Sequence, residues 1–273
     1  MKTIDFFGYN TGRLILGSNP YMGFSYITHK ISRDEMMDYY TADNVVRDLK
    51  YAESLGYTTL IASSNEFTAR YYRQYRNEGG KLKWIAQTHV PLDIKVNVNH
   101  AVEGGAIAIF HQGTSFDGLL ETNQIDVVKN NIDELRRANI PVGIATHVPE
   151  HVYIAEAELN VDFYMTCLHN MRRNNEGRVS SSISGLKNEP HYFVYEDREL
   201  MFKAIRATDK PCIAYKILAG GNYAFNKDDL RQCFVETYAN IKPNDFATVG
   251  VFQRDKDQIR ENLMLVEEIL KGE

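Results

Sequence analysis

The chain has 273 residues, of which 44% are apolar and 25% are charged, and this composition excludes a disordered tail, a collagen-like fibre and a small disulfide-linked module. Its 31 lysines and arginines against 36 aspartates and glutamates give a net charge of −5, so we expect no nucleic-acid partner. The three cysteines are scattered, Asp5 stands where a signal peptide would be apolar, and no apolar run reaches about 20 residues. These features predict a reduced, cytoplasmic protein with no membrane span.

Short β-rich apolar runs alternate with amphipathic helical runs along the whole chain. The expected strands cover residues 14–17, 58–62, 82–88, 106–110, 142–146, 161–167, 212–216 and 247–251. The expected helices cover residues 41–55, 66–76, 97–103, 121–138 and 255–270, and another begins at Pro149. Eight strands, each followed by a helix, in a chain near 250 residues predict a (β/α)8 TIM barrel, with residues 1–273 as a single domain. An open doubly wound sheet is the alternative, but Gly17-Ser18-Asn19-Pro20 does not supply its glycine fingerprint.

One connection is long. Residues 170–196 follow the sixth strand, and barrel connections are commonly 2–6 residues. This segment carries Arg172, Arg173 and Arg178, which can bind an anionic substrate through paired hydrogen bonds. We expect it to act as a lid over the barrel mouth, and a surface insertion without function is the alternative.

Four histidines stand at the ends of four consecutive expected strands, where a barrel carries its chemistry. They are His89, His111, His147 and His169. Neutral imidazoles with a carboxylate such as Glu66 can hold a divalent metal, for which zinc, manganese and iron are the candidates. Without a metal, the same histidines can perform acid–base catalysis near neutral pH. A purely structural role is the third alternative.

Lys216 ends the seventh expected strand, beside Tyr215 and Ile217. A desolvated lysine there suits Schiff-base or proton-transfer chemistry, and an ion pair with Glu66 is the alternative. Gly220-Gly221 and Arg254 stand where a barrel commonly binds phosphate, so they suggest a phosphate or another anionic group.

Two further patterns are interpreted as lacking a catalytic role. His147-Val148-Pro149-Glu150-His151 matches a zinc-peptidase pattern, but Pro149 begins the helix and leaves His147 on the strand, so His151 is expected to be an ordinary helix residue. The tyrosines of Tyr71-Tyr72-Arg73-Gln74-Tyr75 are expected on a helix surface that faces solvent or a partner.

Several of these segments resemble the aldo-keto reductase family. Val249-Gly250-Val251-Phe252-Gln253-Arg254, followed by residues 257–263, resembles the family's last strand and cofactor-binding helix, and Ile217-Leu218-Ala219-Gly220-Gly221 resembles the end of its seventh strand. The resemblance implies NADPH binding by Gly220, Gly221, Arg254 and Asn262, and it places His111 at the family's catalytic histidine. The rest of the catalytic set is not kept, because the second strand ends without the aspartate and the third without the lysine.

The leading hypothesis is therefore a barrel enzyme with reductase-like architecture and altered chemistry. His111, Lys216 and Glu66 are the candidate catalytic residues, and the four strand-end histidines are the candidate metal ligands. The expected reaction is hydrolase, lyase or isomerase chemistry on a small polar or anionic molecule. An NADPH-dependent oxidoreductase and a non-catalytic ligand-binding barrel are the alternatives.

Overall fold

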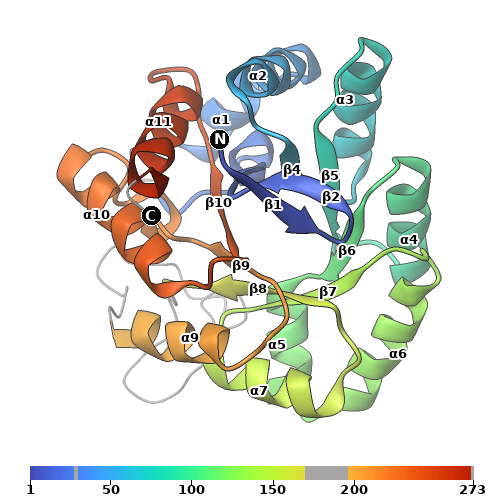
Figure 1. Ribbon diagram of the computed structural model, residues 1–273. Coiled ribbons are helices and arrows are strands. Elements are labelled where there is room, and N and C mark those ends of the chain that lie inside the picture. The colour runs from blue at the N-terminus through green and yellow to red at the C-terminus, as the bar shows by residue number, and fades with distance from the viewer. Residues whose placement is uncertain (28–29, 170–195, 272–273) are drawn as a thin grey trace.

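Eight parallel strands close into a barrel in the computed structural model, which describes residues 1–27, 30–169 and 196–271. The strand order is β10-β3-β4-β5-β6-β7-β8-β9, so each strand pairs with its neighbours in the chain and the last closes on the first (Figure 1). The strands are β3 (Leu14–Gly17), β4 (Thr59–Ser63), β5 (Lys83–Gln87), β6 (Ala108–His111), β7 (Val142–Thr146), β8 (Phe163–Cys167), β9 (Cys212–Tyr215) and β10 (Phe246–Gly250). The expected single-domain (β/α)8 barrel is confirmed.

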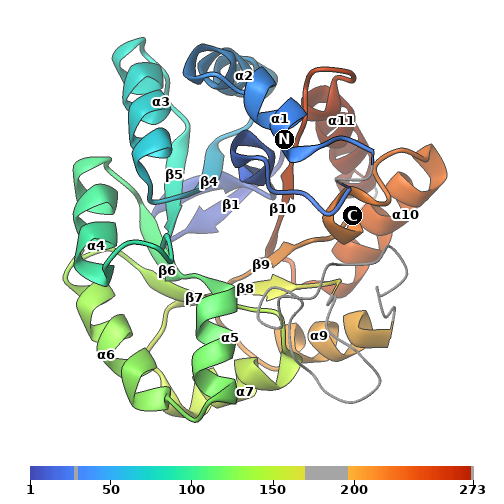
Figure 2. The same ribbon diagram turned by 180° about the vertical axis from the view of Figure 1, so that it is seen from behind.

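Helices surround the barrel (Figures 1 and 2). The α-helices are α1 (Arg33–Tyr39), α2 (Ala42–Leu55), α3 (Glu66–Asn77), α4 (Ile94–Glu103), α5 (Gly113–Glu121), α6 (Ile125–Arg136), α7 (Pro149–Glu158), α9 (Glu196–Arg206), α10 (Lys227–Asn240) and α11 (Gln258–Leu270). Two 3₁₀ helices, η1 (Asn19–Met22) and η2 (Ala219–Gly221), follow β3 and β9. Local sequence sets several of these ends: Thr41 caps α2 through its side chain, Gly56 ends it with φ +107°, and Pro149 opens α7.

A hairpin that the periodicity did not predict precedes the barrel. It pairs β1 (Thr3–Phe6) with β2 (Tyr9–Gly12) and lies across the end of the barrel that faces the viewer in Figure 1. Phe6 is fully buried among the core residues of the barrel interior, and its ring lies 5.3 Å from Phe163 and 5.4 Å from Phe246. The hairpin therefore closes the amino-terminal end, and the carboxyl ends of the strands form the open mouth on the opposite side (Figure 2).

Two expectations about helices were wrong. Residues 121–138 do not form one long helix, because α5 ends at Glu121 and α6 begins at Ile125 after a turn in which Asn123 has φ +56°. The tyrosines of α3 do not face solvent or a partner, because Tyr71, Tyr72 and Tyr75 are each at most 3% exposed. They pack into the core between α3, α2 and β5, where Tyr72 lies against Trp84.

Two expectations concern segments rather than the barrel itself. Among the described residues, none of the helices combines the length and the apolar character that a membrane span requires. The expected lid, with Arg172, Arg173 and Arg178, lies outside the described residues.

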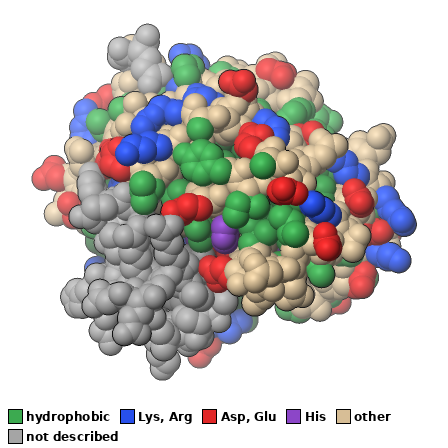
Figure 3. All heavy atoms as spheres, turned by 90° about the horizontal axis from the view of Figure 1, so that it is seen from below, with side chains coloured by type: hydrophobic (Ala, Val, Ile, Leu, Met, Phe, Trp, Pro, Cys, Tyr) green, Lys and Arg blue, Asp and Glu red, His purple; other side chains and the backbone are tan. Residues whose placement is uncertain are grey.

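The side of the molecule that carries α7 has apolar side chains on its surface. α7 exposes Tyr153 and Ile154. Figure 3 views the molecule from that side and shows hydrophobic side chains near the centre of the picture.

Candidate active site

The mouth of the barrel begins with a polar layer above the apolar interior. Side chains two residues apart on a strand point to the same face. The barrel interior contains one core residue near the end of each of five strands, and the residue two positions later on each strand therefore also faces inward. These core residues are Ile61, Ile85, Ala145, Met165 and Ile213. The residues two positions later are Ser63, Gln87, His147, Cys167 and Tyr215. Gln87 donates to the Ser63 hydroxyl at 3.1 Å, and the Tyr215 hydroxyl donates to the carbonyl of Thr146 at 3.0 Å. This layer is the part of the interior that can make polar contacts with a ligand.

His147 is held in this layer by Asp117 of α5. The two carboxylate oxygens of Asp117 lie 2.8 Å from Nδ1 of His147 and 2.8 Å from Nδ1 of His151, and the carboxylate also accepts the backbone N–H of His147 at 2.9 Å. The Thr146 hydroxyl donates to the same carboxylate at 2.5 Å. Asp117 is fully buried and His147 is 5% exposed, so this network is rigid and shielded from water.

Burial alone would raise the pKa of Asp117, but the hydrogen bonds from His147 and His151 hold that pKa well below its ordinary value. Asp117 is therefore a carboxylate at neutral pH, and it accepts the Nδ1 hydrogen of His147. This contact fixes the tautomer of His147 that carries its lone pair on Nε2.

The start of α5 explains how Asp117 reaches β7. Gln112 caps the helix by accepting the N–H of Ser115 at 2.8 Å. Gly113, one helical turn before Asp117, lies so close to β7 that a Cβ there would be 3.2 Å from the carbonyl of Ala145 and from Cε1 of His147. A glycine therefore allows the close approach that brings Asp117 to the histidine.

Lys216 follows β9 at the rim. Its Nζ donates to the Tyr26 hydroxyl at 2.8 Å and lies 6.0 Å from the centroid of the Tyr215 ring. The His147 ring lies 5.5 Å from the same ring in an edge-on arrangement. His147 and Lys216 thus flank one aromatic side chain, and the partner of Lys216 among the described residues is Tyr26 rather than the expected Glu66.

The other strand-end histidines do not converge on His147. His111 points outward to α6, where its Nε2 lies 3.0 Å from Asn131 and its Nδ1 lies 3.2 Å from the carbonyl of Gln112. Burial lowers the pKa of His111, in keeping with a neutral ring that uses both nitrogens. His89 is half-buried on the rim, and burial also lowers its pKa.

His169 is fully buried beside α9. Its Nδ1 lies 2.8 Å from the carbonyl of Lys216, and its Nε2 lies 3.0 Å from the guanidinium of Arg198. Burial and the charge of Arg198 lower the pKa of His169 to about 3. Within the described part of the chain, no three His, Cys, Asp or Glu side chains are grouped so that they could hold a metal ion.

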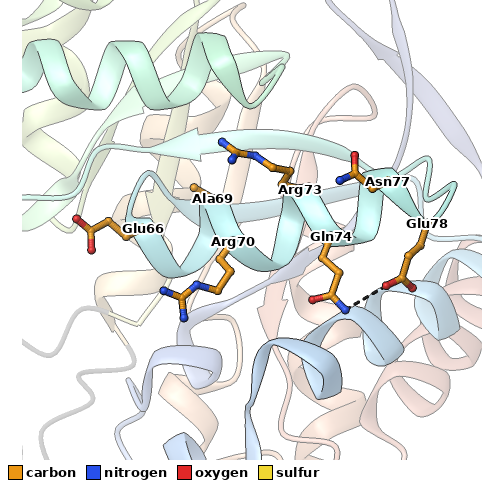
Figure 4. Close-up of a pocket in the computed structure, with 7 residues that line it drawn as sticks. All are labelled: Glu66, Ala69, Arg70, Arg73, Gln74, Asn77 and Glu78. Carbon is orange, nitrogen blue, oxygen red and sulfur yellow. Dashed lines mark hydrogen bonds between the residues drawn. The ribbon is translucent and has the colours of Figure 1, made fainter.

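Glu66 is exposed at the first position of α3. It borders a pocket on the outer surface of that helix, lined also by Arg70, Arg73 and Gln74, rather than the barrel mouth (Figure 4). The structure therefore does not bring Glu66 to Lys216 or to the strand-end histidines.

The residues that the family resemblance connects with NADPH are spread over the mouth. Gly220 and Gly221 lie against Tyr26 and Ile27. Arg254 borders a second hollow beside α2, but its guanidinium is bound to Asp255 at 2.8 Å and to Glu35 at 3.3 Å. Asn262 is 3% exposed, so its side chain is buried in α11 rather than presented to a ligand.

Sequence reasoning missed Asp117, Tyr26 and the role of His151. The expectation that His151 is an ordinary helix residue was wrong, because it is 7% exposed and bound to the same carboxylate as His147. A signal for Asp117 exists in the sequence, since an acid between Phe116 and Leu119-Leu120 interrupts an apolar helix face. Tyr26 carries no local signal, because its partner is 190 residues away in the chain.

Comparisons with known proteins place the fold. No family model matches the chain, and no curated protein sequence matches it. A protein from Pseudomonas aeruginosa named as an aldo-keto reductase superposes with a TM-score of 0.57 at 15% identity, covering 96% of this chain and 93% of that one. A truncated 3-deoxy-D-arabino-heptulosonate 7-phosphate synthase from Thermotoga maritima gives a TM-score of 0.57 at 13% identity, with coverage of 99% and 91%. The chain is thus distantly similar in structure to aldo-keto reductases and to these synthases, and at such identities the likeness shows the (β/α)8 barrel alone.

Proposed function

We propose that the chain is an acid–base enzyme acting on a small polar or anionic molecule, with His147 as the group that moves the proton. The observation that carries the proposal is the buried Asp117 carboxylate, which accepts Nδ1–H of His147 at the carboxyl end of β7. Catalytic groups of (β/α)8 enzymes lie at that end. A histidine oriented by a carboxylate can take a proton on Nε2 and return it later in the same reaction.

Lys216 supplies the positive charge that such a reaction needs. Removing a proton leaves negative charge on the substrate, and a fixed cation next to the site stabilises that charge in the transition state. The shared contact with Tyr215 supports the view that His147 and Lys216 serve one site. No redox partner is required, so the reaction belongs to hydrolase, lyase or isomerase chemistry.

The acid–base form of the hypothesis fits the described residues better than the metal form. A metal site needs several ligand atoms that converge on one point. The ring nitrogens of His111 and His169 are instead bound to groups on the helix side of the barrel. The contact of His147 Nδ1 with Asp117 suits either form, because a metal-bound histidine also donates its second ring N–H to a carboxylate. Among the described residues, however, no group of three His, Cys, Asp or Glu side chains could hold a metal ion.

The test is a turnover screen that does not presuppose the substrate. Pools of small esters, hydroxy acids, oxo acids and hydroxycarbonyl compounds are incubated with the protein in D2O and a chelator, and ¹H NMR follows conversion or loss of carbon-bound hydrogen. We expect at least one pool to react, and His147→Gln to lower the rate by roughly 100-fold or more. His89→Gln, a rim histidine outside the Asp117 network, is the matched control. Full activity in His147→Gln, or activity that disappears with the chelator, would contradict the proposal.

A further inference from the structure

The contact between Tyr26 and Lys216 is built into the rim by two separate segments. Lys216 leaves the end of β9, and Tyr26 lies in the loop that follows η1. The Lys216 Nζ donates to the Tyr26 hydroxyl at 2.8 Å and lies 4.5 Å from the centroid of the ring. The ammonium therefore contacts both the oxygen and the face of the same phenol, which is a more specific arrangement than a surface hydrogen bond.

The backbone around the pair is shaped to receive the phenol. The N–H of Tyr26 donates to the carbonyl of Gly220 at 3.2 Å. Gly220 has φ +63°, and a Cβ at this position would lie 2.2 Å from Cδ2 of the Tyr26 ring. Only glycine fits both the backbone conformation and the space at this position. The Tyr26 ring can therefore take its place only because the turn after β9 has a glycine there.

The lysine itself stands in an uncommon conformation. Lys216 has φ +54°, and Ala219 has φ +49° three residues later. Residues other than glycine rarely adopt the left-handed region, and they do so where the surrounding structure holds them. The strain lies at the residue whose ammonium meets Tyr26, beside the Tyr215 ring that also contacts His147.

From this geometry we infer that Tyr26 is the proton donor of the site and that the substrate is an α-hydroxy aldehyde or α-hydroxy ketone; the inference rests on the proposed function of His147. In the Lys216–Tyr26 contact the ammonium is the donor, so the contact does not use the hydroxyl hydrogen of Tyr26. That hydrogen can be given to a substrate oxygen, and the ammonium then stabilises the charge left on the phenol oxygen. In this role Lys216 acts as an ammonium, whereas a Schiff base would require its neutral amine.

The reaction that follows is redox-neutral and balanced. His147 Nε2 takes the proton from the carbon that bears the hydroxyl, and the electrons of the C–H bond form a C=C bond to the carbonyl carbon. The carbonyl π electrons move to the oxygen, which takes the proton of Tyr26 and completes an enediol. The reverse steps return the His147 proton to the former carbonyl carbon and the hydroxyl proton of the neighbouring carbon to Tyr26. The product is the isomeric hydroxycarbonyl compound. The hydroxyl and amide of Ser63 and Gln87, in the same inward layer, suit the hydroxyl groups of such a substrate.

The experiment uses the full chain with glyceraldehyde, dihydroxyacetone and hydroxyacetone as probes. ¹H NMR in D2O measures isomerisation and deuterium incorporation, and calorimetry measures binding of glycolohydroxamic acid, a stable mimic of the enediolate. We expect Tyr26→Phe, which keeps the ring over Gly220, to lower kcat about 100-fold with little change in KM, and to weaken hydroxamate binding at least about tenfold. Lys216→Gln should show the same pattern. Tyr223→Phe, a nearby tyrosine whose ring contacts His169 instead, is the matched control.

The outcomes separate this inference from the proposed function. Suppose that His147→Gln abolishes deuterium exchange and Tyr26→Phe does not. That result would overturn the role of Tyr26 but would leave the role of His147 in place. Covalent capture of a probe on Lys216 by borohydride, located by peptide mass spectrometry, would overturn it in favour of a Schiff base. If the wild-type protein neither exchanges the probes nor binds the hydroxamate, the substrate class is wrong, whatever other pools the protein converts.

Discussion

Asp117 is the residue on which the candidate site most depends, because one carboxylate accepts hydrogen bonds from Thr146, His147 and His151. Each of these donors is buried, and His147 and His151 would lose this acceptor if the carboxylate were removed, whereas the Thr146 hydroxyl also lies 3.2 Å from the carbonyl of Val148. A buried donor without an acceptor costs about 1–3 kcal/mol. The same group therefore contributes to stability and orients the proposed base.

We predict that Asp117→Asn lowers turnover of any substrate found in the screen by roughly 100-fold or more and lowers the free energy of unfolding by about 1–3 kcal/mol. The amide has one acceptor oxygen and must turn its NH2 group toward a donor, so His147 loses its fixed tautomer. Urea unfolding and steady-state rates measure the two effects, and Asp126→Asn on the exposed face of α6 is the control. Unchanged turnover in Asp117→Asn would remove the basis for the proposed role of His147.

The burial of His169 predicts how the free energy of unfolding depends on pH. Its pKa in the folded protein is about 3, against about 6.5 in the unfolded chain, because of burial and the charge of Arg198. A lowered histidine pKa means that the folded state disfavours the extra proton. The contribution that the neutral His169 makes to the free energy of unfolding is therefore fully present above pH 6.5 and is lost as the pH falls toward 3.

At pH 5 this one group lowers the free energy of unfolding by about 2 kcal/mol relative to pH 8. His169→Gln keeps a donor for the Lys216 carbonyl or an acceptor for Arg198, but it does not titrate. We expect the difference in stability between pH 8 and pH 5 to shrink by about that amount in the variant. An equal pH dependence in both proteins, measured by urea unfolding, would show that His169 is not buried in its neutral form.

At the scale of secondary structure, the regular repeats were predictable and the exceptions have physical causes. The strands are apolar runs with turn residues at their ends, and β7 has the bounds expected from the sequence. α5 was missed because Gly113, Thr114, Ser115 and Gly118 have low helix propensity. Its packing against β7 outweighs that propensity, and Asp117 was missed with it.

The hairpin at the start of the chain was missed for a related reason. Its turn places Phe7 at φ +51° and Gly8 at φ +87°, where Asn-Gly or Gly-Gly would be the recognisable signal. A phenylalanine in the left-handed region is uncommon, so the sequence did not indicate a turn there. The closure of the barrel by Phe6, which is a long-range contact, compensates for this local cost.

The hairpin should stabilise the fold without affecting chemistry. We predict that Phe6→Ala lowers the free energy of unfolding by about 3–5 kcal/mol, because it leaves a cavity among Phe163 and Phe246. The kcat for any substrate found in the screen should change less than about twofold, since the mouth lies at the opposite end of the barrel. Phe7→Ala, at a position that is 38% exposed, is the control and should cost much less stability. A large loss of kcat in folded Phe6→Ala would indicate coupling between the two ends.

For the whole molecule, the barrel and the location of its mouth followed from the sequence, whereas the composition of the site did not. Strand ends at one rim are a consequence of the parallel fold, so His147 and Lys216 could be placed there in advance. The direction of each side chain depends on register. For this reason His111 and His169 turn toward the helices, while Asp117 and Tyr26 enter from elements that the sequence did not connect with the site.

The sequence resemblance to aldo-keto reductases implied NADPH binding, and the charges around Arg254 give a prediction about it that can be measured. The sequence resemblance implies that Arg254 would bind the 2′-phosphate, but Asp255 and Glu35 already neutralise its guanidinium at 2.8 and 3.3 Å. Asn262 is buried and cannot assist without a rearrangement of α11. We therefore predict an NADPH Kd weaker than about 100 μM, corresponding to less than about 5.5 kcal/mol of binding free energy, and no reduction of simple aldehydes.

The double variant Glu35→Gln with Asp255→Asn removes the competing acids and should tighten NADPH binding about three- to tenfold. Arg254→Gln in that background should reverse the gain. Fluorescence titration at low salt measures each constant, because screening by salt would hide the effect. A micromolar Kd in the wild-type protein, with turnover of an aldehyde, would mean that hydride transfer takes place on this barrel after all, and that His147 and Tyr26 serve a reductase.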